Sequence, residues 1–180
     1  MAGIGKTAFA VHVAHRLAGQ FPDGQIFLPL HGHTPGQHPV DPAEALASLL
    51  LTAGIAARHI PPGLEARSRL WRHYLAGKRV LLLLDDAAGH EQVRALLPGT
   101  AGTLVMITSR KHLTALEDAD MVSLDTLPPA ESAELLIWLA ARPDLTDSDA
   151  AVNEVTHLCG YLPLAIGIIA RQLHHHPAWR

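Results

Sequence analysis

Residues able to bind phosphate lie near the start of the chain. Gly5-Lys6-Thr7 match the end of the phosphate-loop pattern, in which a glycine and four further residues precede Gly-Lys-Ser/Thr. Met1 to Ile4 supply the four middle positions, so the first glycine would lie one residue before Met1. In such a loop, N–H groups surround phosphate oxygens, the lysine reaches the β- and γ-phosphates, and the threonine ligates Mg²⁺. The predicted nucleotide contacts are Ala2, Gly3, Ile4, Gly5, Lys6, Thr7 and Ala8, although a chance Gly-Lys-Thr before a helix is the alternative.

Two acidic residues follow the most apolar run of the chain. Val80 to Leu84 is uninterrupted, as is typical of a strand buried on both faces of a parallel sheet. The carboxyl ends of such strands face the ligand, so Asp85 is predicted to hold Mg²⁺ together with Thr7. Asp86 is predicted to act in catalysis by orienting or deprotonating the attacking water. Capping of the next helix is the alternative role for Asp86.

A third polar group follows another predicted strand. The run from Thr103 to Thr108 delivers Thr108, Ser109 and Arg110 at its carboxyl end. An arginine there would read the γ-phosphate and stabilise charge in phosphoryl transfer, which gives Arg110 a catalytic role. A solvent-facing arginine in a loop is the alternative. Three such groups in this order predict a phosphate-loop NTPase.

Helices and strands must alternate to position these groups. Strands are predicted over residues 25–30, 80–84, 103–108 and 121–124, and helices over 7–17, 42–53, 64–76 and 91–97, with a further short helix after 108. Beyond Pro128 three helices are predicted, over 128–141, 147–158 and 162–173. Trp71 and Trp138 are predicted to anchor the core. The fold class is therefore α/β, a phosphate-loop NTPase parallel sheet over residues 1–125 followed by a small helical subdomain over 126–180.

The last predicted helix begins in a family-specific motif. The residues from Cys159 to Ala165, Cys-Gly-Tyr-Leu-Pro-Leu-Ala, resemble the Gly-Leu-Pro-Leu-Ala motif of NB-ARC domains, which belong to the STAND class of signal-transduction ATPases. Tyr161 departs from that motif, which has glycine or leucine there. The whole chain is similar to this family and looks most like the modules of SARP-type and related actinobacterial regulators. The other segments that carry the resemblance are 1–7, 21–25, 80–86, 108–110, 124–127 with Glu131, and 173–179.

The resemblance implies a nucleotide switch. ATP with Mg²⁺ would favour an open signalling state, and slow hydrolysis would restore a closed ADP state. Pro163 would pack near the adenine or ribose, because proline in the first turn of a helix makes a rigid wall; a helix start alone is the alternative. Effector and sensor domains would lie outside these residues, and nucleotide-dependent self-association is a further option.

The resemblance also implies a strand that these residues do not contain. In the STAND arrangement, the strand that feeds the phosphate loop lies between the two strands that carry the acidic pair and the Arg110 group. We therefore expect Val80–Leu84 and Leu104–Thr108 to face an empty slot with unpaired backbone groups.

The amino-acid composition excludes some classes of function for this protein. Fourteen basic against seventeen acidic residues argue against a nucleic-acid-binding surface. The single cysteine, Cys159, fits a reducing cytosol, and the apolar runs are too short for a membrane span. The histidines, including His31, His33 and His38, are predicted to be structural or solvated and not metal ligands. A cytoplasmic location is expected, and two competing functions stay open: a small-molecule kinase and a scaffold that binds no nucleotide.

Overall fold

The structure, a computed structural model, describes residues 1–116 and 119–176. These residues form two compact units, one of residues 1–6 with those from Met121 onward and one of Thr7–Asp120. The predicted boundary between residues 125 and 126 stays a prediction. The last residues of the predicted 173–179 segment, including Trp179, lie outside the described residues. No helix in the described part of the chain is long and apolar enough to cross a membrane.

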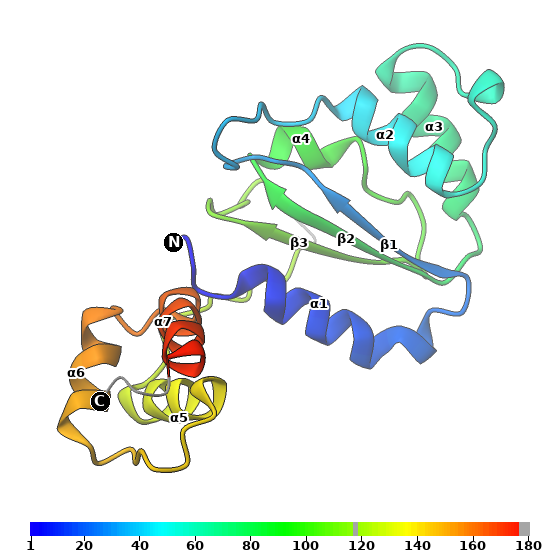
Figure 1. Cartoon of the computed structure of the whole chain (residues 1–180). Helices are drawn as coiled ribbons and strands as arrows, with labels where there is room; N and C mark the ends of the chain where they lie inside the picture. Colours follow the sequence, from blue (N-terminus) through cyan, green and yellow to red (C-terminus); the bar gives the residue numbers. More distant parts are fainter. Residues whose placement is uncertain (117–118, 177–180) are drawn as a thin grey trace. The chain divides into compact units, whose positions relative to one another are not determined.

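A three-stranded parallel sheet forms the centre of the unit Thr7–Asp120. Its strands are β1 (Gly24–Pro29), β2 (Val80–Ala87) and β3 (Leu104–Ser109), in the order β1-β2-β3 (Figure 1). Residues Val80–Leu84 are buried, as the apolar run predicts. The prediction of an empty slot between these two strands is wrong, because β2 pairs directly with β3. Leu82 lies opposite Val105 and Leu84 lies opposite Ile107. The backbone groups that were expected to lack partners therefore face one another.

Helices cover both faces of this sheet (Figure 1). On one face lies α1 (Lys6–Leu17), whose Ala10 and Ala14 share a core cluster with Leu81 and Leu83. The other face carries α2 (Pro42–Thr52), α3 (Leu64–Leu75) and α4 (His90–Arg94). Leu82 and Leu84 belong to the core on this side, since successive strand residues point to opposite faces. Two short 3₁₀ turns, Ala18–Gln20 and Ala57–His59, also belong to the described part of this unit.

A local cap begins α2, and a long-range hydrogen bond ties α3 to the core. Asp41 caps α2, accepting hydrogen bonds at Oδ1 from the N–H groups of Ala43 (2.8 Å) and Glu44 (3.4 Å). On α3, Trp71 is fully buried and its Nε1–H donates to the Leu96 carbonyl at 2.9 Å. The prediction that Trp71 anchors the core is confirmed.

Three helices make up the second unit. They are α5 (Pro129–Ala140), α6 (Ala150–Leu158) and α7 (Pro163–His175). Their shared core includes Leu136 and Ile166. The prediction that Trp138 anchors a core is wrong, because its side chain is 75% exposed. Trp138 lies two residues, roughly 200° of helix rotation, from buried Leu136, so it faces away from the core.

Two smaller elements predicted between the sheet and α5 do not form. Residues 121–124 have no regular structure, and Met121 and Val122 are exposed. A strand needs a neighbour for its backbone hydrogen bonds, and the described residues of this helical unit hold no other strand. The short helix predicted after residue 108 is also absent from the described residues between Ser109 and Met121.

Candidate functional site

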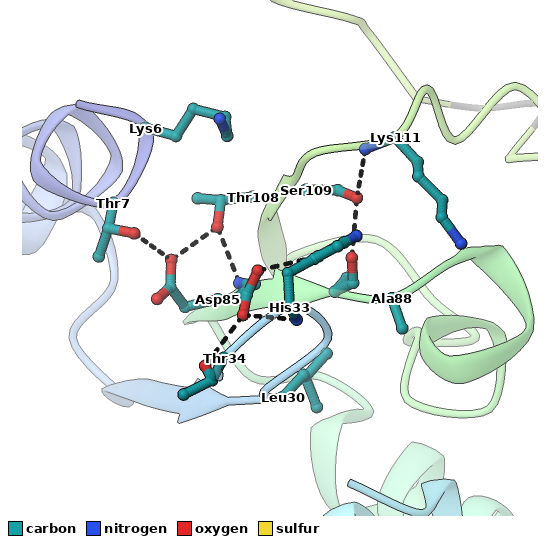
Figure 2. Close-up of polar contacts among 12 residues, drawn as sticks. Lys6, Thr7, Leu30, His33, Thr34, Asp85, Ala88, Thr108, Ser109 and Lys111 are labelled. Carbon is teal, nitrogen blue, oxygen red and sulfur yellow. Dashed lines mark hydrogen bonds and ion pairs between the residues drawn. The ribbon is translucent and has the colours of Figure 1, made fainter. Parts of the chain in front are cut away.

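A hydrogen-bonded cluster lies at the carboxyl ends of β2 and β3 (Figure 2). The hydroxyl of Thr7, on α1, donates to Asp85 Oδ1 at 2.7 Å. The hydroxyl of Thr108, at the end of β3, donates to the same oxygen at 2.6 Å. Asp85 Oδ2 accepts no hydrogen bond from the described residues, so one carboxylate oxygen is left for a ligand. The structure therefore brings together Thr7 and Asp85, the two predicted metal ligands.

Thr108 also contacts the second acidic residue. Its oxygen accepts a hydrogen bond from the Asp86 N–H at 2.9 Å. The register between β2 and β3 shifts between Leu84 and Ala87, and Asp86 has φ 55°. This conformation is uncommon for a residue other than glycine. The sequence predicts Thr108 at the carboxyl end of its strand, but its contacts with Asp85 and Asp86 are not among the predicted roles.

The carboxylate of Asp86 is held by two residues far away in the sequence. It accepts hydrogen bonds from the His33 N–H at 2.9 Å, from His33 Nδ1 at 3.1 Å and from the Thr34 hydroxyl at 3.1 Å. His33 Nδ1 must be the protonated ring nitrogen, since an ionised carboxylate only accepts. Partial burial raises the pKa of Asp86, but the bonds from His33 and Thr34 outweigh burial and the net shift is downward. Asp86 therefore caps the turn at His33 and not the start of α4.

The segment that carries His33 and Thr34 is a closed loop of residues 31–39, called here the 31–39 loop. Its ends are joined by a hydrogen bond from the Val40 N–H to the Leu30 carbonyl at 2.9 Å. The side-chain amide of Gln92, on α4, donates to the Leu30 carbonyl at 3.0 Å and to the Val40 carbonyl at 2.8 Å. Its Oε1 accepts from the Ala88 N–H at 2.8 Å. One buried amide thus ties the base of the loop to the end of β2.

Glycine is required where this loop meets β2. The Gly32 N–H donates to the Asp86 carbonyl at 2.6 Å. A Cβ atom at Gly32 would lie 2.5 Å from that carbonyl oxygen, which is closer than van der Waals contact allows. The close approach is what lets the next two residues reach the Asp86 carboxylate.

Arg110 lies apart from these contacts. Its side chain is exposed and makes no hydrogen bond or ion pair within the described chain. Ser109 instead donates its hydroxyl to the Ala87 carbonyl at 2.8 Å and accepts from the Lys111 N–H at 3.0 Å (Figure 2). The catalytic role of Arg110 stays a prediction.

The glycine loop and the motif around Pro163 contact each other within the other unit. The Gly3 carbonyl accepts a hydrogen bond from the Leu164 N–H at 3.1 Å, and a Cβ at Gly5 would lie 4.0 Å from Pro163 Cγ. Gly3 and Gly5 have φ of 77° and 93°, a region that favours glycine. Lys6 Nζ donates to the Met1 carbonyl.

The other predicted nucleotide contacts differ in exposure. Ala2 and Ala8 are exposed, and Ile4 is half-buried. Pro163 begins α7 and lines a groove of about 510 Å³ with Leu164, Ile168 and Arg171 among others. Tyr161 has φ 55°, a conformation that glycine would adopt with less strain.

The chain is similar to one segment of two curated regulatory proteins. It is 42% identical over 177 residues to regulatory protein AfsR of Streptomyces coelicolor (strain ATCC BAA-471 / A3(2) / M145). It is 40% identical over 177 residues to regulatory protein AfsR of Streptomyces griseus. Each match covers 98% of this chain and 18% of the relative, so the chain spans about a fifth of the length of these proteins. No protein-family model matches the chain.

Proposed function

We propose that this chain is a Mg²⁺-dependent ATP- and ADP-binding module of a regulatory protein. The observation that carries the proposal is the hydrogen bond between Thr7 and Asp85, two residues that lie 78 positions apart. In phosphate-loop NTPases the loop threonine and a carboxylate at a strand end hold the metal together. Thr7 directly follows the Gly-Lys pair, and Asp85 directly follows the buried run of β2.

The residues at this place fit a magnesium ion. Mg²⁺ prefers oxygen ligands and is bound by one or two carboxylates, retained waters and substrate phosphates. The Thr7 hydroxyl and Oδ2 of Asp85, which accepts no hydrogen bond from the described residues, are such ligands. The bond from Thr108 to Oδ1 fixes the orientation of the Asp85 carboxylate. When bound, Mg²⁺ would neutralise phosphate charge between the β- and γ-phosphates.

The glycine loop fits phosphate oxygens. The positive φ angles of Gly3 and Gly5 turn the backbone in a way that concentrates N–H groups in anion-binding loops. Lys6 adds the charge that reaches the β- and γ-phosphates, and Ala2, Ile4 and Ala8 would contribute backbone contacts. Pro163 would supply an apolar wall for the base or ribose, and Arg110 would contact the γ-phosphate.

The regulatory part of the proposal rests on the similarity to the two Streptomyces proteins. Their name describes regulation, and the chain matches one segment of each. A cytoplasmic switch that alternates between ATP and ADP, with slow hydrolysis aided by Asp86, would control effector domains elsewhere in such a protein. Control of transcription, an NB-ARC identity and nucleotide-dependent self-association belong to the same proposal.

Titration of the protein with ADP and ATP, with and without Mg²⁺, tests the binding function. Lys6→Ala is expected to weaken ATP binding at least about tenfold, or about 1.4 kcal/mol, because it removes the loop's cation. Lys78→Ala is the matched control, since Lys78 precedes β2 at the opposite end of the strand from Asp85 and lies over the Tyr74 ring. An unchanged dissociation constant in Lys6→Ala would show that the loop is not the binding site.

Turnover separates the remaining functions. Slow hydrolysis of ATP without an acceptor supports the switch. Transfer of the γ-phosphoryl group to a small-molecule acceptor, with ADP released only when that acceptor is present, would indicate a kinase. Absence of nucleotide binding by the unaltered protein would indicate a scaffold.

A further inference from the structure

The 31–39 loop fixes Asp86 from several directions. Gly32 binds the Asp86 carbonyl, and His33 and Thr34 supply all three donors that the described residues direct at its carboxylate. Thr108 accepts from the Asp86 N–H. The side chains of His33 and Asp86 are each 21% exposed. Both the backbone and the carboxylate of Asp86 are therefore held, while part of the pair stays open to solvent.

The loop itself is anchored in the core. Gln92, which holds both ends of the loop, is almost completely buried. Val40 and Leu30 pack in the core beneath α2. A loop closed at its base in this way presents His33 and Thr34 in one arrangement, so its hold on Asp86 is built into the fold and is not a chance surface contact.

We infer that His33 and Thr34 are positioning residues that orient Asp86 for nucleotide hydrolysis. The inference rests on the proposed function, and it adds two residues outside the phosphate-loop pattern to that site. A carboxylate that orients water must be held closely, because a small displacement costs much of the rate. Asp86 Oδ2 accepts two of the three bonds and Oδ1 accepts one, which leaves Oδ1 with capacity for a water.

Steady-state hydrolysis by the intact protein tests this role. His33→Ala is expected to lower kcat by about tenfold to a hundredfold, since Asp86 loses its ring donor. KM and the ADP dissociation constant are expected to stay within about twofold of the unaltered values, because the described hydrogen bonds of His33 go to Asp86 and not to Asp85, the predicted metal ligand. His38→Ala is the matched control, because His38 is an exposed histidine of the same loop.

Conservative variants separate positioning from a structural or chemical role. His33→Asn keeps a donor near the place of Nδ1 and is expected to restore most of kcat. Thr34→Ser keeps the hydroxyl and is expected to act normally, whereas Thr34→Val is expected to lower kcat with KM unchanged. Failure of both His33→Asn and Thr34→Ser to restore kcat would overturn the positioning role, as would equal losses in kcat and ADP binding.

A measurement without nucleotide tests the contact itself. In a double-mutant cycle of urea unfolding, His33→Ala and Asp86→Ala are expected to be non-additive, because each removes the other's partner. Additive effects would overturn the inference. A protein that binds nucleotide without hydrolysing it would overturn the inference and leave the proposed binding function standing. A protein that binds no nucleotide would overturn both.

Discussion

Thr108 joins the two acidic side chains at the end of β2, donating to one and accepting from the backbone of the other. Thr108→Val keeps the shape and removes both hydrogen bonds, which leaves the Asp86 N–H without this partner. We expect the free energy of unfolding to fall by about 1–3 kcal/mol. Urea unfolding measures the change. Thr103→Val is the matched control, since the Thr103 hydroxyl is buried and makes no hydrogen bond to the described residues, and it is expected to be neutral or stabilising. Equal losses in the two variants would contradict the assignment.

Asp144 carries a second residue-level prediction. Arg142 binds it through two parallel hydrogen bonds, Nε to Oδ1 at 2.8 Å and Nη2 to Oδ2 at 2.7 Å. The hydrogen bonds from Arg142 lower the Asp144 pKa from 3.8 to about 2. This interaction stabilises the fold above pH 3.8 and is lost as the pH falls through about 2.

An NMR titration of the Asp144 carboxyl checks this prediction. Arg142→Ala is expected to return its pKa toward the ordinary value, and high salt is expected to reduce the shift because the Asp144 side chain is exposed to solvent. A midpoint near 3.8 in the unaltered protein would contradict the prediction.

At the scale of elements, α5 ends in a Schellman motif that lacks its usual glycine. The N–H of Ala141 donates to the Trp138 carbonyl and that of Arg142 to the Ile137 carbonyl. Ala141 has φ 51°, which costs an alanine about 1 kcal/mol. Ala141→Gly is therefore expected to raise the thermal stability of the helical unit by about 1 kcal/mol.

Ala76, at the end of α3, is the matched control for this change. It is also exposed, but its φ is −57°. Ala76→Gly is expected to lower stability by about 0.5–1 kcal/mol, because glycine adds only chain entropy there. Calorimetry of the two variants gives opposite signs if the left-handed conformation of Ala141 is correct.

At the scale of the whole molecule, the chain folds around separate cores in its two units. Leu82 is fully buried in the unit Thr7–Asp120, and Leu136 is almost fully buried among α5, α6 and α7. Each Leu→Ala change is expected to destabilise its own unit by about 2–5 kcal/mol. Hydrogen exchange should show Leu136→Ala exposing the amides of α5 and α7 first, and Leu82→Ala exposing those of β2. Equal loss of protection everywhere in both variants would contradict independent cores.

Features that depend on neighbouring residues in the sequence were predictable. The cap at Asp41 and the buried strand from Val80 to Leu84 follow from residue types a few positions apart. The contact of Thr7 with Asp85 could also be predicted, because a helix N-terminus and a strand's carboxyl end meet at the same edge of a parallel sheet. For these features, local chemistry and the parallel topology leave few alternatives.

Only the tertiary structure decided the strand pairing, the exposure of Trp138 and the contacts of Asp86. The direct pairing of β2 with β3 depends on which strands are present to share hydrogen bonds, and the exposure of Trp138 depends on which face of α5 the other helices cover. The hydrogen bond between His33 and Asp86 joins residues 53 positions apart, and His33 lies in a loop whose sequence has no helix or strand periodicity. Sequence by itself determined which residues can donate, accept or pack apolar surface. Which of them meet was decided by packing, because a residue's spacing predicts its face but not what covers that face.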